Sequence, residues 1–263
     1  MLIASSHRRW DDKVALISGA SRGLGAEIAR IYAQEGATVW VNYFQSEDKA
    51  NAVVEEITKA GGKAMAVQAD VTDEQQVIAM VKTIVDKSGR LDIIVNNALP
   101  KYKFDATAPY TSIETVSWEN MDQQICGAIK GAINTTKAAL PTFKAQSYGK
   151  IVNVSTNLIY NPVVTYYDYT TAKAGLVGLT RNLATELGQY GVRVNILAGG
   201  LLETTDASSA TSPEIFQAIA STTPLRKTTS TQDFAKASVF FASEMSDAVT
   251  GQSISIDGGL TMP

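Results

Sequence analysis

The chain has 263 residues, of which 45% are hydrophobic and 19% charged, and its formal net charge is −3. There is no basic excess to suggest a nucleic-acid partner, and no apolar run approaches the roughly 18 residues of a membrane helix. The single cysteine, Cys126, excludes an internal disulfide and fits a cytoplasmic location. The single histidine, His7, excludes a histidine metal cluster.

The start of the chain differs from the rest. Residues 1–12 contain no apolar segment of the kind that a signal peptide has, so we expect a flexible N-terminal extension there. Beyond it, short β-branched runs alternate with longer helical periods. One such period places Ala50, Val53, Val54 and Ile57 at the i, i+3, i+4, i+7 spacing of an amphipathic helix.

Seven segments have the apolar character of buried strands. They are 14–17, 38–41, 63–67, 92–95, 151–154, 193–197 and 253–256. Strands that are apolar on both faces and alternate with helices indicate a parallel sheet covered on both sides. Right-handed crossovers then give a doubly wound sheet. The sequence therefore predicts the α/β class, with one Rossmann-type domain at 13–263 built on a seven-stranded parallel sheet.

A glycine-containing turn, Ser-Gly-Ala-Ser-Arg-Gly-Leu-Gly at 18–25, follows the first predicted strand and opens the first helix. Glycine permits a tight bend and lets the backbone approach a pyrophosphate, and a helix N-terminus offers free N–H groups to it. The turn predicts a dinucleotide site. Its expected contacts are Gly19, Ser21, Arg22, Gly23, Leu24 and Gly25.

The glycine spacing GxxxGxG, rather than GxGxxG, resembles the short-chain dehydrogenase/reductase family, whose turn reads TGxxxGxG. Ser18 takes the place of its threonine. Asp70-Val71 resembles the acidic-apolar pair that flanks the adenine in that family. Asn96-Asn97-Ala98 matches most of the family's NNAG motif, and Tyr169 to Lys173 matches its YxxxK motif. The resemblance runs from about residue 13 to residue 259 and is strongest to the 3-oxoacyl-(acyl-carrier-protein) reductase branch. It implies a nicotinamide-dependent oxidoreductase that interconverts carbonyl and alcohol.

The segment after the second predicted strand indicates which nicotinamide is used. NAD-binding folds carry an acidic residue there for the ribose 2′-hydroxyl, but no acid occurs before Glu47. Arg22 can balance a 2′-phosphate, and Asn42, Tyr43 and Ser46 can add hydrogen bonds to it. The sequence predicts NADPH rather than NAD. The remaining cofactor contacts implied by the resemblance are Asp70, Val71, Asn97, Ala98, Tyr169, Lys173, Leu202 and Thr204.

The resemblance makes Thr156, Tyr169 and Lys173 the catalytic residues. Tyr169 and Lys173 are four residues apart and share one helix face. An ammonium about 4 Å from the phenol would lower the tyrosine pKa by about three units, to near 7, where general acid catalysis works well. Thr156 stands where the family has serine. Its hydroxyl can still bond a substrate carbonyl, although the added methyl restricts χ1.

Three further positions depart from the family. Ala128 replaces an asparagine that helps to hold a proton-relay water, and Asn120 or Gln124 could substitute for it. Leu99 replaces the glycine of NNAG beside the nicotinamide. Gly199-Gly200 replaces Pro-Gly, which we expect to loosen the segment that follows.

Two segments, 100–117 and 202–231, are the least regular, and we expect both to contact the substrate. The first contains Tyr102, Phe104 and Tyr110. The second is rich in serine and threonine and lacks strong periodicity, so we expect a mobile flap.

Three functions fit these residues. The first is an NADPH-dependent ketone reductase with Tyr169 as the general acid. The second is an enoyl-thioester reductase that uses Tyr166, seven residues before Lys173. The third is a catalytically weak NADPH-binding regulatory or scaffold member of the family. The resemblance also implies a homotetramer or homodimer, formed through a small-residue helix (Ala174, Gly175, Gly178) and the C-terminal Asp257-Gly258-Gly259.

Overall fold

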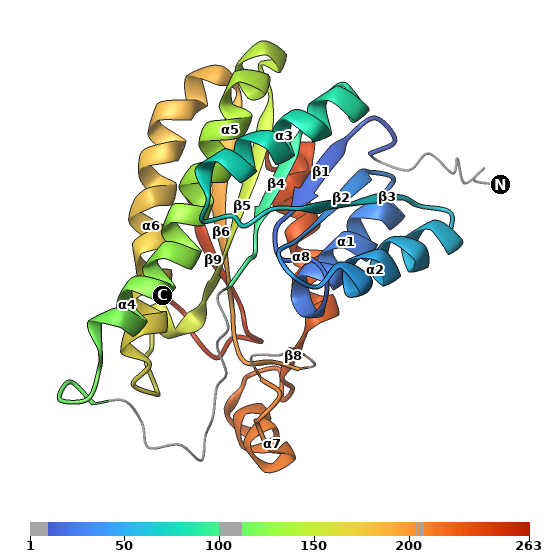
Figure 1. Ribbon diagram of the computed structural model, residues 1–263. Helices are drawn as coiled ribbons and strands as arrows, with labels where there is room; N and C mark the ends of the chain where they lie inside the picture. The colour runs from blue at the N-terminus through green and yellow to red at the C-terminus, as the bar shows by residue number, and fades with distance from the viewer. Residues whose placement is uncertain (1–9, 100–111, 204, 206–207) are drawn as a thin grey trace.

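The computed structural model describes residues 10–99, 112–203, 205 and 208–263 (Figure 1). Its main sheet has seven strands, all paired in parallel, in the order β3-β2-β1-β4-β5-β6-β9. The strands are β1 (Val14–Ile17), β2 (Thr38–Tyr43), β3 (Lys63–Gln68), β4 (Ile93–Asn96), β5 (Gly149–Thr156), β6 (Val192–Gly199) and β9 (Ser253–Ile256). The predicted doubly wound, seven-stranded parallel sheet is confirmed.

Helices cover both faces of the sheet. One face carries α1 (Gly23–Glu35), α2 (Glu47–Lys59) and α8 (Thr231–Ala242), and the other carries α3 (Glu74–Ser88), α5 (Gly131–Gln146) and α6 (Tyr167–Leu187). Alternate strand residues supply the two cores. In β1, Ala15 and Ile17 face the first layer, and Val14 and Leu16 face the second. The part of the chain that the structure describes holds no helix long and apolar enough to cross a membrane.

The helix before β5 is interrupted. It begins as α4 (Trp118–Ile125), widens into a π-helical turn, η1 (Cys126–Lys130), and continues as α5. Single π-turns often occur at functional sites. This one brings Gly127 to the wall of the main cavity described below, and Ala128 to the wall of a second, small cavity.

The segment 202–231 is more regular than expected. It contains two short strands, β7 (Leu202–Glu203) and β8 (Thr229–Ser230), with α7 (Pro213–Thr222) between them. The expectation of a segment without periodic structure is therefore wrong for α7. Pro213 at the first helical position and the i, i+4 pair Ile215 and Ile219 were helix signals that the abundance of serine and threonine obscured. No residue of α7 is fully buried, and the helix lies beyond the end of the sheet (Figure 1).

Residues 1–9 of the expected extension, and 100–111 of the first substrate segment, lie outside the described residues. Trp10, inside the expected extension, is only 3% exposed. Its ring packs edge-on against Tyr32, with ring centroids 4.9 Å apart, and the Trp10 backbone N–H donates to the Glu35 carbonyl. Trp10 is thus packed into the core of the domain, although it lies inside the expected extension.

Candidate active site

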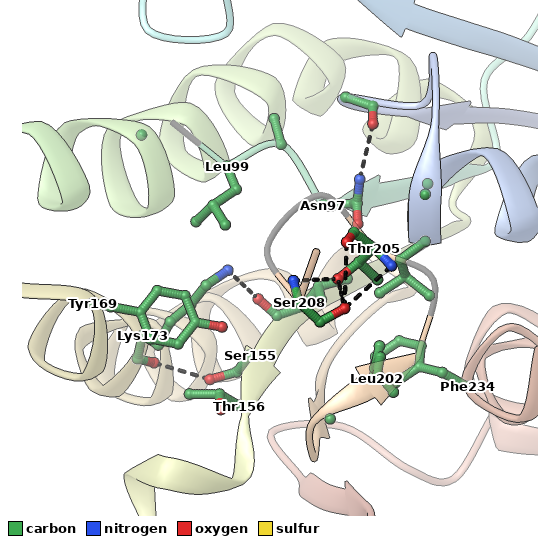
Figure 2. Close-up of a pocket in the computed structure, with 18 of the residues that line it drawn as sticks. Asn97, Leu99, Ser155, Thr156, Tyr169, Lys173, Leu202, Thr205, Ser208 and Phe234 are labelled. Carbon is green, nitrogen blue, oxygen red and sulfur yellow. Dashed lines mark hydrogen bonds between the residues drawn. The ribbon is translucent and has the colours of Figure 1, made fainter. Parts of the chain in front are cut away.

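A cavity of about 1100 Å³ opens at the carboxyl ends of the strands (Figure 2). It lies over the junction of β1 and β4, where the strand order reverses, and ligands of doubly wound folds bind at such a point. The cavity brings together all the predicted site residues that the structure describes: Gly19, Ser21, Arg22, Gly23, Leu24, Gly25, Asn42, Tyr43, Ser46, Asp70, Val71, Asn97, Ala98, Thr156, Tyr169, Lys173 and Leu202. Thr204 lies outside the described residues.

The glycines of the β1–α1 turn are required by close packing. Gly19 and Gly23 have φ of +61° and +56°, a left-handed conformation that side chains disfavour. A Cβ at Gly25 would lie 2.5 Å from the Asn97 side-chain nitrogen and 2.6 Å from the Gly19 carbonyl oxygen. The first turn of α1 therefore has no room for a side chain at Gly25, and its backbone N–H groups stay open to a ligand.

Ser18 and Asn97 join this turn to the end of β4. The Ser18 hydroxyl donates to the Val95 carbonyl and accepts from the N–H groups of Asn97 and Ala98, both at 3.0 Å. The Asn97 amide donates back to the carbonyls of Ser18 and Gly19 at 2.9 and 3.1 Å. Serine thus supplies the hydroxyl that the family's threonine would supply.

The end of the cavity where the sequence predicts the adenosine differs from expectation in one respect. Asn42 is buried, and its carboxamide accepts from the Gly19 N–H at 3.1 Å and donates to the Ala69 carbonyl at 3.1 Å. It therefore braces the glycine turn and is not free to bind a 2′-phosphate. Arg22 remains at the exposed rim, where its guanidinium donates to the Ser46 hydroxyl at 3.0 Å.

Two carboxylates near this end have polar neighbours. Asp70 accepts from the N–H and hydroxyl of Thr72, each at 2.8 Å. Glu47 lies near the Tyr43 hydroxyl. Burial, and after it the charge of this carboxylate, raises the Tyr43 pKa. Glu47 is not part of the cavity wall.

At the opposite end, Thr156 ends β5 and Tyr169 and Lys173 lie on α6, all three buried (Figure 2). The Thr156 hydroxyl lies beside Tyr169, and it acts to lower the Tyr169 pKa. The Ser155 hydroxyl points toward α6, where it donates to the Lys173 carbonyl at 3.2 Å. Thr156, not Ser155, therefore presents its hydroxyl beside the tyrosine.

The expected lowering of the tyrosine pKa is wrong for this arrangement. The Lys173 ammonium donates to the Val154 carbonyl at 2.7 Å and lies 5.9 Å from the Tyr169 ring centroid. Burial raises the Tyr169 pKa to about 12, although the neighbouring Thr156 hydroxyl lowers it in part. Burial also lowers the Lys173 pKa to about 8. Helical spacing alone cannot reveal this desolvation. It disfavours the charged forms of both side chains, the tyrosinate and the lysine ammonium.

The departures from the family have physical consequences. Ala128 borders a second, small cavity of about 10 Å³ whose wall includes Lys173, close to the minimum size for one water molecule. Asn120 is exposed and Gln124 lines neither cavity, so neither replaces the missing asparagine there. Leu99 projects into the main cavity near Tyr169 (Figure 2).

Glycine at position 200 has a packing role that the sequence does not reveal. A Cβ there would lie 2.9 Å from the Asp257 Cβ, so the backbone has no room for one. We expected Gly199-Gly200 to loosen the backbone of the segment that follows. The close approach of Asp257 to the Gly200 backbone offsets this effect.

Several cavity residues were not predicted. Thr205 and Ser208 bond each other through their hydroxyls at 2.7 Å, and the Thr205 Cα lies 3.9 Å from a Cβ built on Gly23 (Figure 2). This contact places Thr205 beside the glycine turn. The chain's C-terminal segment and α7 complete the wall with Leu260, Thr261, Ile215 and Ile219. The amphipathic pair on α7 was the one available sequence signal among these residues.

Comparison with known proteins identifies relatives over nearly the whole chain. A family model described as enoyl-(acyl carrier protein) reductase matches residues 19–261. A 3-oxoacyl-(acyl-carrier-protein) reductase of Staphylococcus aureus (strain Mu50) is 36% identical over 252 residues, which cover 95% of this chain and 98% of the relative. One from Synechocystis is 35% identical over 253 residues, covering 95% and 97%.

Solved structures agree with this result. A gluconate 5-dehydrogenase from Burkholderia cenocepacia in complex with NADP and tartrate superposes with a TM-score of 0.87 at 26% identity, covering 98% of each chain. A gluconate dehydrogenase described as putative, from Agrobacterium tumefaciens, gives 0.86 at 30% identity, covering 95% of this chain and 97% of that one. With the motifs assembled in one cavity, these matches show that the chain belongs to the short-chain dehydrogenase/reductase family of oxidoreductases.

Proposed function

We propose that this protein is an NADPH-dependent reductase that transfers a hydride to a ketone, of the 3-oxoacyl type or a related carbonyl compound, with Tyr169 as the general acid. The position of the Thr156 hydroxyl beside the buried Tyr169 phenol, whose pKa it acts to lower, carries the proposal. Both groups lie in the wall of the cavity that contains the glycine turn. A carbonyl oxygen placed between them can accept a hydrogen bond from each.

The residues at the other end fit the cofactor. The close-packed Gly19 and Gly25 let a pyrophosphate approach the N-terminus of α1, and Arg22 with Ser46 offers a cation and a hydroxyl to a 2′-phosphate. The NADP-bound gluconate 5-dehydrogenase supports the same cofactor type. The 1100 Å³ cavity slightly exceeds the usual range of about 300–1,000 Å³ for ligand sites and suits a cofactor together with a substrate.

The chain's own groups then divide the chemistry. NADPH, when bound, supplies the hydride that becomes attached to the carbonyl carbon. The Thr156 hydroxyl orients the carbonyl, and the Tyr169 hydroxyl donates its proton as negative charge develops on the oxygen. The Lys173 ammonium stabilises the tyrosinate that remains and can bond the nicotinamide ribose. General acid catalysis of this kind contributes about 10²–10⁴-fold.

The wall beyond Tyr169 supports a substrate with an apolar arm. Leu158, Val164, Ile215, Ile219 and Leu260 all line the cavity. Their side chains can bury methylene groups, each worth about 0.8 kcal/mol. A 3-oxoacyl chain meets this description, and the named Staphylococcus aureus relative adds support.

The test is NADPH consumption with ketones, acetoacetyl thioesters and enoyl thioesters. Turnover of ketones or acetoacetyl thioesters supports the proposal. Turnover of enoyl thioesters alone favours an enoyl reductase that uses Tyr166, which lines the cavity and agrees with the description of the matching family model. Tight NADPH binding with no turnover of any of them favours a regulatory or scaffold role.

We expect kcat/KM for ketone reduction to fall as the pH rises through about 8. Lys173 loses its proton there because burial lowers its pKa to about 8, whereas Tyr169, with a pKa of about 12, keeps its own. The variant K173M should lack this midpoint. The stability of the fold should change in the opposite direction and rise with pH over the same range. Between pH 8 and 10.5 the folded lysine binds fewer protons than the unfolded one. Its contribution to the free energy of unfolding therefore increases as the pH rises. Rate profiles and urea titrations across this range would measure both.

We expect R22A to reduce the preference for NADPH over NADH by roughly 10–100-fold, since a hydrogen bond to a charged group contributes about 1.5–3 kcal/mol. The loss should appear in the NADPH dissociation constant and shrink at high salt. The matched control is R30A, because Arg30 lies on α1, the helix that Arg22 directly precedes, but pairs with Glu27 and Glu56 outside the cavity. An unchanged cofactor preference in R22A would contradict the assigned role.

We also propose a cytoplasmic homotetramer or homodimer. Ala174, Gly175 and Gly178 form an exposed small-residue face on α6, which permits close approach of a second chain. Closed symmetric assemblies are the usual form of such oligomers. Sedimentation at several concentrations would measure the assembly.

A further inference from the structure

Three wall segments of the cavity meet at one carboxylate that is not itself part of the wall. Asp257 follows β9 directly and is only 5% exposed. Around it lie Asn157 after β5, Gly200 after β6 and Thr261 in the C-terminal segment, and these three residues line the cavity whereas Asp257 does not. The carboxylate therefore sits behind the wall at the proposed substrate end.

The Asp257 carboxylate accepts four hydrogen bonds. Its Oδ2 accepts from the Asn157 amide at 3.0 Å, from the Thr261 N–H at 3.0 Å and from the Thr261 hydroxyl at 2.6 Å. Its Oδ1 accepts from the Gly259 N–H at 3.1 Å. All four donors are neutral, so the negative charge is stabilised by hydrogen bonds that are stronger than bonds between neutral groups.

The same residue fixes the backbone on its third side. The Asp257 Cβ would lie 2.9 Å from a Cβ at Gly200, and the Gly200 N–H donates to the Ile256 carbonyl at 3.3 Å. Asn157, in turn, directly follows Thr156, whose Oγ1 accepts from the Leu158 N–H at 3.3 Å and lies beside Tyr169. Asp257 is thus one hydrogen bond and one peptide unit away from the proposed carbonyl-orienting hydroxyl.

We propose that Asp257 is a positioning residue of the reductase: its carboxylate holds Asn157 and the Gly259–Thr261 segment, and through them it sets the Thr156 hydroxyl and the Leu260 wall against the substrate. The inference rests on the proposed function. It also explains why a charged group is buried at this place, because one acceptor with several lone pairs can satisfy donors from two separate segments at once. Catalysis is sensitive to such placement, since a shift of about 1 Å can cost about 10²-fold in rate.

The variant D257N keeps the size of the side chain but replaces one acceptor oxygen with a donor. We expect kcat/KM for the ketone to fall by roughly 10–100-fold, with a raised KM and a lowered kcat, while the dissociation constant of NADPH stays unchanged. The matched control is D73N. Asp73 also accepts backbone N–H groups, at 2.9 and 3.1 Å, but it does so at the exposed N-terminus of α3 and should leave both kinetic constants unchanged.

A second variant, N157A, removes one of the four donors and leaves the others in place. If Asp257 acts through Asn157, the double variant N157A/D257N should be no slower than D257N alone, because coupled residues are not additive. Additive losses would overturn this route. If D257N fails to fold, N157A alone must still raise the KM for the ketone without weakening NADPH binding, and an unchanged KM would overturn the proposal.

Amide hydrogen exchange separates this inference from the proposed function, because it needs no turnover. In D257N, exchange should speed up together in the segments after β5 and after β9, and it should not do so in D73N. Unchanged exchange in both segments would overturn the role of Asp257 even if ketones are reduced. If D257N shows the expected faster exchange but the protein reduces no ketone, the result would count against the reductase function and not against the role of Asp257.

Discussion

The variant Y169F should lose ketone reduction by about 10²–10⁴-fold, the usual contribution of a general acid. Phenylalanine keeps the buried ring, which is 8% exposed, but removes the only proton donor of that side chain. Binding of NADPH should persist, because the glycine turn and Arg22 are untouched. Single-turnover rates and the fluorescence of bound NADPH would measure the two properties separately.

The control for this variant is Y166F. Tyr166 precedes α6 and also lines the cavity, so its removal should change KM more than kcat. A severe loss of activity in Y166F together with an active Y169F would reverse the assignment. It would also favour reduction of an enoyl double bond over reduction of a ketone.

The variant G25A should weaken NADPH binding by at least roughly tenfold and destabilise the fold by about 1–3 kcal/mol, as overpacking usually does. Helix propensity alone predicts the opposite sign, because alanine is favoured over glycine by about 1 kcal/mol within a helix. Packing decides, since the new Cβ would lie 2.6 Å from the Gly19 carbonyl oxygen and 2.9 Å from the Ala20 Cα, both backbone atoms. Only a displaced turn can accept it.

The control is G188A at the end of α6. Gly188 has helical φ and ψ of −55° and −37°, and a Cβ there would meet nothing within 4 Å. The free energy of unfolding should rise by about 0.5–1 kcal/mol, with unchanged NADPH affinity. Urea titrations and cofactor titrations on both variants give the comparison. A G25A protein that binds NADPH normally would mean that the turn can relax.

The strands and most helices followed from the sequence because their signals are local. All seven strands contain the apolar runs expected of them, and only the ends of some differ. In β5 the apolar pattern stops at Val154, yet the strand continues through Ser155 and Thr156 because its neighbour β6 pairs with them. Helix α7 was missed because its ten residues include several small and polar ones and contribute no fully buried residue.

The site residues were predictable by type and position, but their interactions were not. Asn42 has the right place to contact a ribose, yet its amide is bonded to backbone groups of two other segments. The tyrosine pKa was misjudged because burial is a property of the folded chain and cannot be read from an i, i+4 spacing. Asp257 is one hundred residues from Asn157, and no periodicity links the two.

The bonds between Ser18 and Asn97 join two motifs that lie 79 residues apart in the chain. A fragment that stops before β4 would carry the entire glycine motif but not the amide that closes against it. Competence to hold a dinucleotide should therefore arise late in folding, when β1 and β4 pair across the centre of the sheet and the long loop between them closes. The nucleotide motif, although contiguous in sequence, becomes a binding site only as part of the assembled sheet.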